Sequence, residues 1–290
     1  MPVILAVALA FAALVVAFGA VWLVQLRTRN AGMIDPVWAF TLGGVAVFAA
    51  VAGPGAPLNR LAVALGGGAW GLRLGVHLWR RNRGGPEDPR YAALRERWGE
   101  TAPRRMLGFF MLQAVISIVL SIAFFVPAWQ PQTPSVPAIV GALAIGFAAL
   151  AGEAAADREL RSHLADPAGR GRVCTRGWWR YSRHPNYFFE SLHWCAYTVW
   201  SAGQTWGWLT IVPPCAMAWL LLKLSGVPLL EARLVHTRAG YRDYMATTSA
   251  FIPWPPRRAA DSTTTAVPPR RHGGIDGEHD EPHDRPHDHP

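Results

Sequence analysis

Long apolar runs constrain the fold of this chain more than any other feature. A helix needs about 20 apolar residues to cross the hydrocarbon core of a bilayer, and 51% of the 290 residues are hydrophobic whereas only 16% are charged. We expect an all-α, polytopic membrane helix bundle of about seven transmembrane helices, with Pro213 and Pro214 bending the last one. The candidate spans cover residues 3–26, 36–53, 60–79, 107–127, 136–152, 187–203 and 205–223.

Basic residues indicate which side of the membrane each loop occupies. Almost all of the +9 net charge is arginine, because Lys223 is the only lysine. Arginines are concentrated after the first, third and fifth runs, whereas the loops after the second, fourth and sixth contain only Arg60. Cytoplasmic loops carry the positive excess, so we expect a multi-pass protein of the inner (plasma) membrane with its N-terminus outside and its C-terminus cytoplasmic. Arginines placed between apolar runs, rather than on one soluble face, argue against nucleic acid as a partner.

The two ends of the chain require separate treatment. The first run has no basic residue before it and no small-residue cleavage site, so we expect a retained helix rather than a signal peptide. Residues 257–290 end in "GEHDEPHDRPHDHP", and their low hydrophobicity predicts a disordered tail after a membrane domain of residues 1–256. We predict no metal site, because alternating Asp and Pro leave the tail histidines without fixed geometry. The three cysteines are also too few and too far apart for zinc.

The concentrated polar motifs all fall on the cytoplasmic side of this predicted topology. Each has a structural explanation as well as a functional one: a helix cap, a hydrogen-bonded core group, or a solvated ion-pair face. Asp35 could cap a helix, and Arg73 with His77 could be hydrogen-bonded core groups. The helical stripe of Glu153, Asp157 and Arg161 could be a solvated ion-pair face.

The stretch "YSRHPNYFFE" at residues 181–190 has a weaker structural explanation. Asn186 and Glu190 are four residues apart at the start of an apolar run, so a helix places them on one face. A glutamate that faced lipid there would be costly. We therefore expect these side chains to line a polar pocket that opens to the cytoplasm, with arginines close enough to hold an anion.

Three motifs with compatible spacing carry a family resemblance. "GWWRYSRHPNYFFE" (177–190), "SGVPLLE" (225–231) and "YRDYMATTSAFIP" (241–253) resemble the bacterial branch of the steroid 5-alpha-reductase-like integral membrane proteins, over about residues 35–255. The resemblance implies a bundle that binds NADPH from the cytosolic side and transfers hydride to the activated C=C bond of a lipophilic, steroid-like or isoprenoid enone. No GxGxxG motif opens a helix after a strand, so the nucleotide would bind within the bundle.

The resemblance also implies roles for individual residues. Asp157 and the Pro-Asn-Tyr-x-x-Glu element at 185–190 match residues that contact the cofactor. Asp35, His77 and Tyr91 lie in the part of the chain that corresponds to the catalytic residues that polarise a substrate ketone. Guanidinium groups clamp phosphate oxygens, which suits three of the expected contacts to the phosphates: Arg161, Arg176 and Arg183. The full set of expected cofactor-binding residues is Asp157, Arg161, Arg176, Arg183, His184, Asn186, Tyr187, Glu190, Glu231, Tyr241 and Tyr244.

Two other functions stay open. Isoprenylcysteine and phospholipid methyltransferases, which use S-adenosylmethionine on a lipid or prenylated substrate, share an Arg-His-Pro-x-Tyr element and a distal Glu and Tyr pair. Residues 183–187 fit the first, and Glu231 with Tyr241 or Tyr244 fits the second, although the Asn and Glu of the 185–190 element fit the reductase better. A membrane scaffold or transporter would leave the one-sided polar clustering unexplained. The identity of the substrate and the oligomeric state are not predicted.

Overall fold

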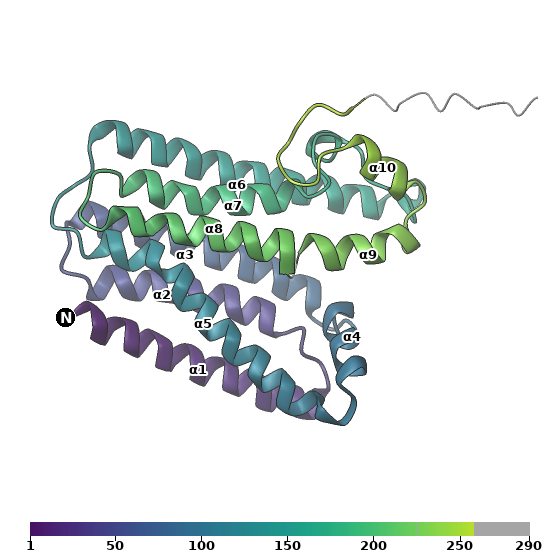
Figure 1. The fold of residues 1–290 in the computed structure, drawn as a ribbon, viewed down its shortest axis with the longest axis horizontal. Helices are drawn as coiled ribbons and strands as arrows, with labels where there is room; N and C mark the ends of the chain where they lie inside the picture. The colour runs from purple at the N-terminus through teal and green to yellow at the C-terminus, as the bar shows by residue number, and fades with distance from the viewer. Residues whose placement is uncertain (225, 258–290) are drawn as a thin grey trace, which may run out of the picture. The chain divides into compact units, whose positions relative to one another are not determined.

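The computed structural model describes residues 1–224 and 226–257, which form one compact helical unit (Figure 1). The predicted tail lies outside these residues, apart from Arg257. Within the described ranges, the only β contacts are two isolated bridges, Arg172 with Ala239 and Ser182 with Ser249. The α-helices are α1 (Val3–Thr28), α2 (Ile34–Ala52), α3 (Pro57–Asn82), α4 (Pro89–Trp98), α5 (Ala102–Ala128), α6 (Val136–Ala165), α7 (Pro185–Trp200), α8 (Val212–Trp219), α9 (Val227–Thr237) and α10 (Tyr241–Thr247).

Six helical stretches of the described chain are long and apolar enough to cross a membrane, so the prediction of an all-α membrane bundle is confirmed. They contain α1, α2, α3, α5 and α6, and the stretch from Gly207 to Thr237 that includes α8. The sixth predicted run forms α7, which has 16 residues and is therefore only ~24 Å long. It lies beside α6 in Figure 1 and packs extensively against it.

The expected proline bend in the last run is wrong. Pro213 and Pro214 lie in the first turn of α8, directly after the 3₁₀ helix Gly207–Ile211. The first turn is where proline fits best, because the amide hydrogens that it lacks have no partner within the helix there. The irregular part of the run comes later, as a π-helical turn over Leu220–Leu224.

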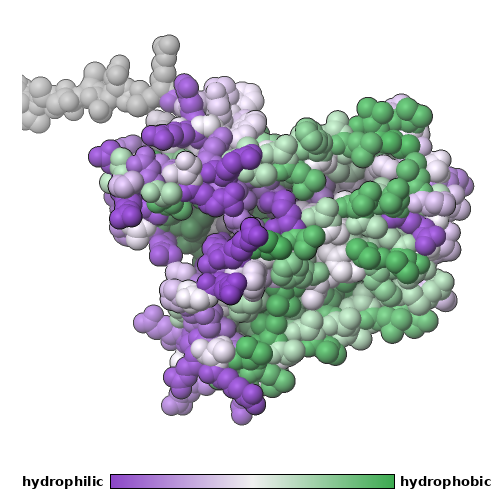
Figure 2. All heavy atoms as spheres, turned by 180° about the vertical axis from the view of Figure 1, so that it is seen from behind, coloured by the Kyte–Doolittle hydropathy of each residue, from purple (hydrophilic) through white to green (hydrophobic). Residues whose placement is uncertain are grey.

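Successive long helices run in opposite directions, so the bundle has two chemically different ends (Figure 1). The N-terminus and the turns 53–56, 129–135 and 201–206 lie at one end, which we call the opposite end because it lies opposite the polar end defined below. The loops 29–33 and 166–184 lie at the other end with α4, α9 and α10. We call this the polar end, because Figure 2 shows most hydrophilic residues gathered over it, whereas hydrophobic residues cover most of the remainder of that face.

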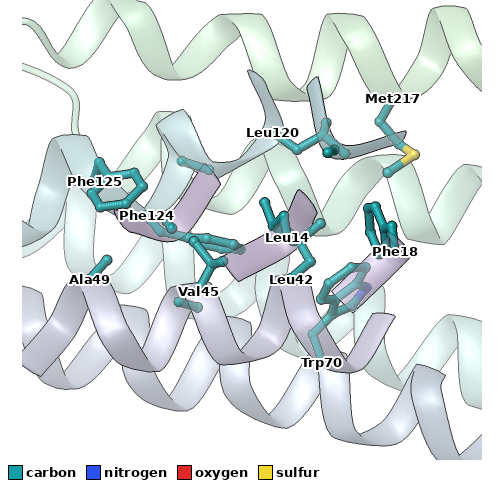
Figure 3. Packing of buried hydrophobic residues seen from close by; sticks show 14 of the residues in the cluster. Leu14, Phe18, Leu42, Val45, Ala49, Trp70, Leu120, Phe124, Phe125 and Met217 are labelled. Carbon is teal, nitrogen blue, oxygen red and sulfur yellow. The ribbon is translucent and has the colours of Figure 1, made fainter. Parts of the chain in front are cut away.

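The core is made by side chains that several helices contribute to one cluster (Figure 3). Leu14 of α1, Leu42 of α2, Trp70 of α3 and Phe124 of α5 are fully or almost fully buried there. The α2 and α3 backbones approach closely, since a Cβ atom built on Gly43 would lie 2.9 Å from the Gly71 Cα. Glycine at both positions therefore permits this close contact between α2 and α3, one residue after Trp70 in α3.

Candidate functional site at the polar end

A buried polar cluster lies between α3, α6 and α7. Arg73 of α3 forms an ion pair with Glu153 of α6, and its second terminal nitrogen lies 3.8 Å from Asp157 Oδ2. Asn186 Nδ2 of α7 donates to Asp157 Oδ1 at 3.4 Å. Glu153 and Asp157 are only 4% and 8% exposed, so this part of the Glu153-to-Arg161 stripe is not a solvated ion-pair face.

Glu190 of α7 is also buried, within electrostatic range of Arg73. Its Oε2 accepts from Trp70 Nε1 at 2.9 Å and its Oε1 accepts from Trp194 Nε1 at 3.1 Å. The Glu190 side chain therefore faces the bundle and not the lipid, as its cost in a bilayer requires. A second buried group lies close by, because the His193 ring stacks on Trp70 with 5.7 Å between centroids.

A second cluster connects α2 to the short helix α4. The Tyr91 hydroxyl donates to Asp35 Oδ1 at 2.5 Å, and Arg90 Nη2 lies 2.5 Å from Asp35 Oδ2. Arg81 of α3 adds a longer contact to the same carboxylate at 3.7 Å. Asp35 makes no capping hydrogen bond in α2, so the helix-cap explanation does not describe it.

The position of α4 is fixed by Asp88, which lies just before the helix. Its Oδ1 accepts from the backbone N–H of Arg90 at 3.0 Å, which is an N-cap, and from the Arg90 side chain. Burial disfavours the charged carboxylate, but the hydrogen bonds and positive charge of Arg90 outweigh burial and hold the pKa of Asp88 below its ordinary value. The cap therefore places Arg90 and Tyr91 beside Asp35.

A third cluster, which we call the clasp, consists of Arg183, His184, Glu231, Tyr241 and Tyr244. Glu231 Oε1 accepts from Arg183 Nε at 2.7 Å, and His184 Nε2 lies 3.0 Å from the same oxygen. Tyr244 donates to the carbonyl oxygens of Trp179 and Ser182. Burial raises the pKa of both clasp tyrosines, so each stays a hydrogen-bond donor at neutral pH.

The clasp changes how Arg183 is interpreted. Besides Glu231, its guanidinium donates to the carbonyl oxygens of Met245 and Thr248, at 3.0 and 2.6 Å. The Arg183 guanidinium thus makes four hydrogen bonds to other residues of the protein, two to Glu231 and two to backbone carbonyls. In this arrangement Arg183 holds α10 in place, and its guanidinium is not open to a phosphate. Arg161 and Arg176, in contrast, are both exposed.

The three clusters adjoin one another. His77 Nδ1 lies 3.5 Å from Arg161 Nη1, and His77 also interacts electrostatically with Arg81 and Asp157. Tyr187 stacks on the His184 ring with 5.4 Å between centroids, and its hydroxyl lies within electrostatic range of Arg90 and Asp35. The predicted residues are therefore brought to one end of the bundle, although within the described part of the chain no side-chain hydrogen bond or ion pair joins Arg176 to the others.

Sequence reasoning left several residues out of the predicted site. Arg73 and Glu153 were noticed but given no role, and Trp70, Arg90 and Trp194 were missed. One signal was present in the sequence: a buried tryptophan needs an acceptor for its indole N–H. Trp70 and Arg73 are three residues apart and share a helix face, which pointed to an acidic partner inside the bundle.

These features define a class of protein: a polytopic helical membrane protein with a network of ionisable side chains at one end of its bundle. The chain belongs to a family of proteins of unknown function, DUF1295, whose family model matches residues 21–248. This match includes all three polar clusters. No curated protein and no solved structure matches the chain.

Proposed function

We propose that the protein is a membrane-embedded, NADPH-dependent reductase of an activated C=C bond in a lipophilic enone, and that its polar end faces the cytoplasm of the plasma membrane. The observation that carries the proposal is the Asp35–Tyr91 pair, a carboxylate and a phenol 2.5 Å apart beside Arg90. It lies at the same end as the separate Asp157–Asn186 pair. The resemblance of residues 177–190 and 241–253 to steroid 5-alpha-reductase-like proteins supports it.

The residues at the polar end fit a dinucleotide. Exposed Arg161 and Arg176 form no ion pair with a carboxylate in the described part of the chain, so their guanidinium groups are available for phosphate oxygens. Asp157 and Asn186 offer an acceptor and an amide for ribose or carboxamide groups. When bound, NADPH would supply the hydride, and the protein has only to orient and polarise the reactants.

The Asp35–Tyr91 pair suits the second requirement, an acid aimed at the carbonyl oxygen on which charge develops. Tyr91 is buried, and its hydroxyl is held by Asp35. A substrate carbonyl that replaced Asp35 as the acceptor would receive the hydrogen bond from Tyr91. The Arg90 guanidinium lies 5.4 Å from the Tyr91 ring centre, where its positive charge favours transfer of the phenolic proton to that oxygen.

The apolar helices account for the lipophilic substrate. The exposed surface of the spans includes Leu72 of α3 and Phe40 of α2, which lie in the halves of these helices nearer the polar end. A substrate dissolved in the bilayer would reach the site with its apolar body still in contact with hydrocarbon. We therefore infer that lipid and a lipophilic small molecule are the partners.

A methyltransferase is the second candidate, and one observation favours it. The structure brings together Arg183, His184, Glu231 and Tyr241, the residues that fit the S-adenosylmethionine-dependent pattern. However, Arg183 and Glu231 neutralise one another, and Arg183 also donates to backbone carbonyls while Glu231 accepts from His184 and Tyr241, which leaves both little capacity for a ligand.

Substitution of Tyr91 tests the reductase. Purified protein in lipid nanodiscs is mixed with NADPH and α,β-unsaturated ketones of increasing apolar length, and loss of NADPH absorbance is followed. Tyr91→Phe should slow oxidation about 10²- to 10⁴-fold, the usual contribution of a positioned acid, and leave NADPH binding unchanged. An exposed phenol provides the control, since Tyr181→Phe should have no effect. Full activity of Tyr91→Phe would exclude Tyr91 as the acid.

A further inference from the structure

Glu231 is the point at which three separate segments meet. It lies on α9 and accepts hydrogen bonds from Arg183, which precedes α7, and from Tyr241, the first residue of α10, at 2.7 and 3.5 Å. His184 adds a third contact from the residue before the first turn of α7. One carboxylate thus joins α9, α10 and the entry to α7.

The segment after α10 is held to the entry of α7 mainly by backbone hydrogen bonds. The amide of Arg183 donates to the Ser249 carbonyl at 2.8 Å, and the amide of Trp254 donates to the Tyr181 carbonyl at 2.9 Å. Ser182 Oγ donates to the Phe251 carbonyl at 2.7 Å. These bonds require the loop 176–184 to keep one conformation, and the carboxylate of Glu231 fixes the two side chains at its end.

The entry to α7 also carries residues of the proposed site. His184 presents one ring edge to Glu231 and one face to Tyr187, so the position of the Tyr187 ring depends on the clasp. Asn186, two residues after His184, donates a hydrogen bond to Asp157. A displacement of the α7 entry would therefore move both the Asn186–Asp157 contact and the Tyr187 ring.

We propose that Glu231 is a positioning residue: it acts through Arg183 and His184 to hold the first turn of α7 in the geometry that the nucleotide site needs, without contact to the nucleotide. This inference rests on the proposed function, because it concerns the same site. It replaces the expectation that Glu231 and Arg183 bind the cofactor themselves. The hydrogen bonds between the Glu231 carboxylate and the Arg183 guanidinium suit this role, because charge-assisted hydrogen bonds are stronger than neutral ones and have a defined geometry.

The test compares two substitutions that each remove one negative charge. Glu231→Gln keeps the side-chain volume but cannot accept all the donors around it, whereas Asp243→Asn changes an exposed carboxylate on α10 that has no ion pair in residues 1–224 and 226–257. Hydrogen exchange of the amides at 181–187 and 249–254 is measured together with the dissociation constant for NADPH. Thermal unfolding reports whether the bundle stays folded.

In Glu231→Gln we expect faster exchange in both segments and NADPH affinity weakened about ten- to a hundredfold, the effect of losing a charged hydrogen bond, with the unfolding of the bundle preserved. Asp243→Asn should match the wild type. Tyr241→Phe, which removes only the 3.5 Å contact, should give a smaller change of the same kind. If Glu231→Gln bound NADPH normally, or weakened binding without faster exchange, the positioning role would be wrong. If the wild type did not bind NADPH, the proposed function would fail, and exchange alone would still show whether Glu231 holds the clasp.

Discussion

The two ends of the bundle are both held by buried hydrogen bonds, but with different chemistry. At the opposite end, Asn59 of α3 is fully buried and donates to the carbonyls of Gln130 and Gln132, at 3.1 and 2.9 Å. Its oxygen accepts from Trp200 Nε1 at 3.0 Å. Neutral groups thus connect the start of α3, the loop after α5 and the end of α7.

At the polar end, ionisable groups take the place of these neutral ones. Arg73, Glu153 and Asp157 form one cluster and Asp35 with Arg90 forms another. Joining loops does not require charge, as Asn59 demonstrates. Because burying charges is costly, a network of ionisable groups is not needed for stability alone, and we therefore propose a functional site at the polar end only.

Removal of one charge from the buried Arg73–Glu153 pair should have the largest effect. Arg73→Met leaves Glu153 without its partner, and we expect a loss of about 3–5 kcal/mol in the free energy of unfolding, as for other broken buried ion pairs. The measurement is thermal unfolding in detergent. Adding Glu153→Gln to the same protein should recover most of that stability while nucleotide binding stays impaired.

Arg81→Met is the matched control for that experiment. Its side chain is about half exposed, with ion pairs of 3.3 and 3.7 Å, and exposed pairs contribute less than about 1 kcal/mol. A double variant that regained both stability and nucleotide binding would show that the buried charges are structural, and the two ends would then differ in chemistry but not in role.

The opposite end should respond in stability alone. Asn59→Leu leaves two carbonyl groups and one indole N–H without their partner, so we expect a loss of about 3 kcal/mol. The exposed Gln132, whose side chain makes no hydrogen bond in the described structure, supplies the control Gln132→Ala. NADPH binding by the folded fraction of Asn59→Leu should equal that of the wild type, and a selective loss of binding would contradict the division between the ends.

The sequence was sufficient to predict which end is polar, because apolar run lengths and arginine counts are properties of single segments. It also predicted that Asn186 and Glu190 share a helix face. The partners of these groups could not be predicted, since Trp70 meets Glu190 and Arg73 meets Glu153 only after distant helices pack. The phosphate role predicted for Arg183 has the same cause: its acceptors, Glu231 and the carbonyls of Met245 and Thr248, lie at least 48 positions away along the chain.

The smallest of these effects distinguishes two nucleotides. If Arg161 binds the 2′-phosphate, Arg161→Ala should weaken NADPH binding about tenfold, as for one lost charged hydrogen bond, and leave NADH binding unchanged. The same comparison applies to Arg176→Ala. Arg158→Ala, an exposed arginine on the same helix as Arg161, is the control. Equal losses for both nucleotides would remove the arginine concerned from that role.

Ligand-induced stabilisation shows whether the polar end of the bundle binds a nicotinamide nucleotide, as we propose. Wild-type protein in detergent is heated with NADPH, NADH or S-adenosylmethionine added separately, each in excess. A ligand at a hundred times its dissociation constant stabilises the native state by about 2.7 kcal/mol, which raises the melting temperature measurably. We expect NADPH to produce this increase and S-adenosylmethionine to produce none. An increase with S-adenosylmethionine alone would contradict the reductase and identify a methyltransferase.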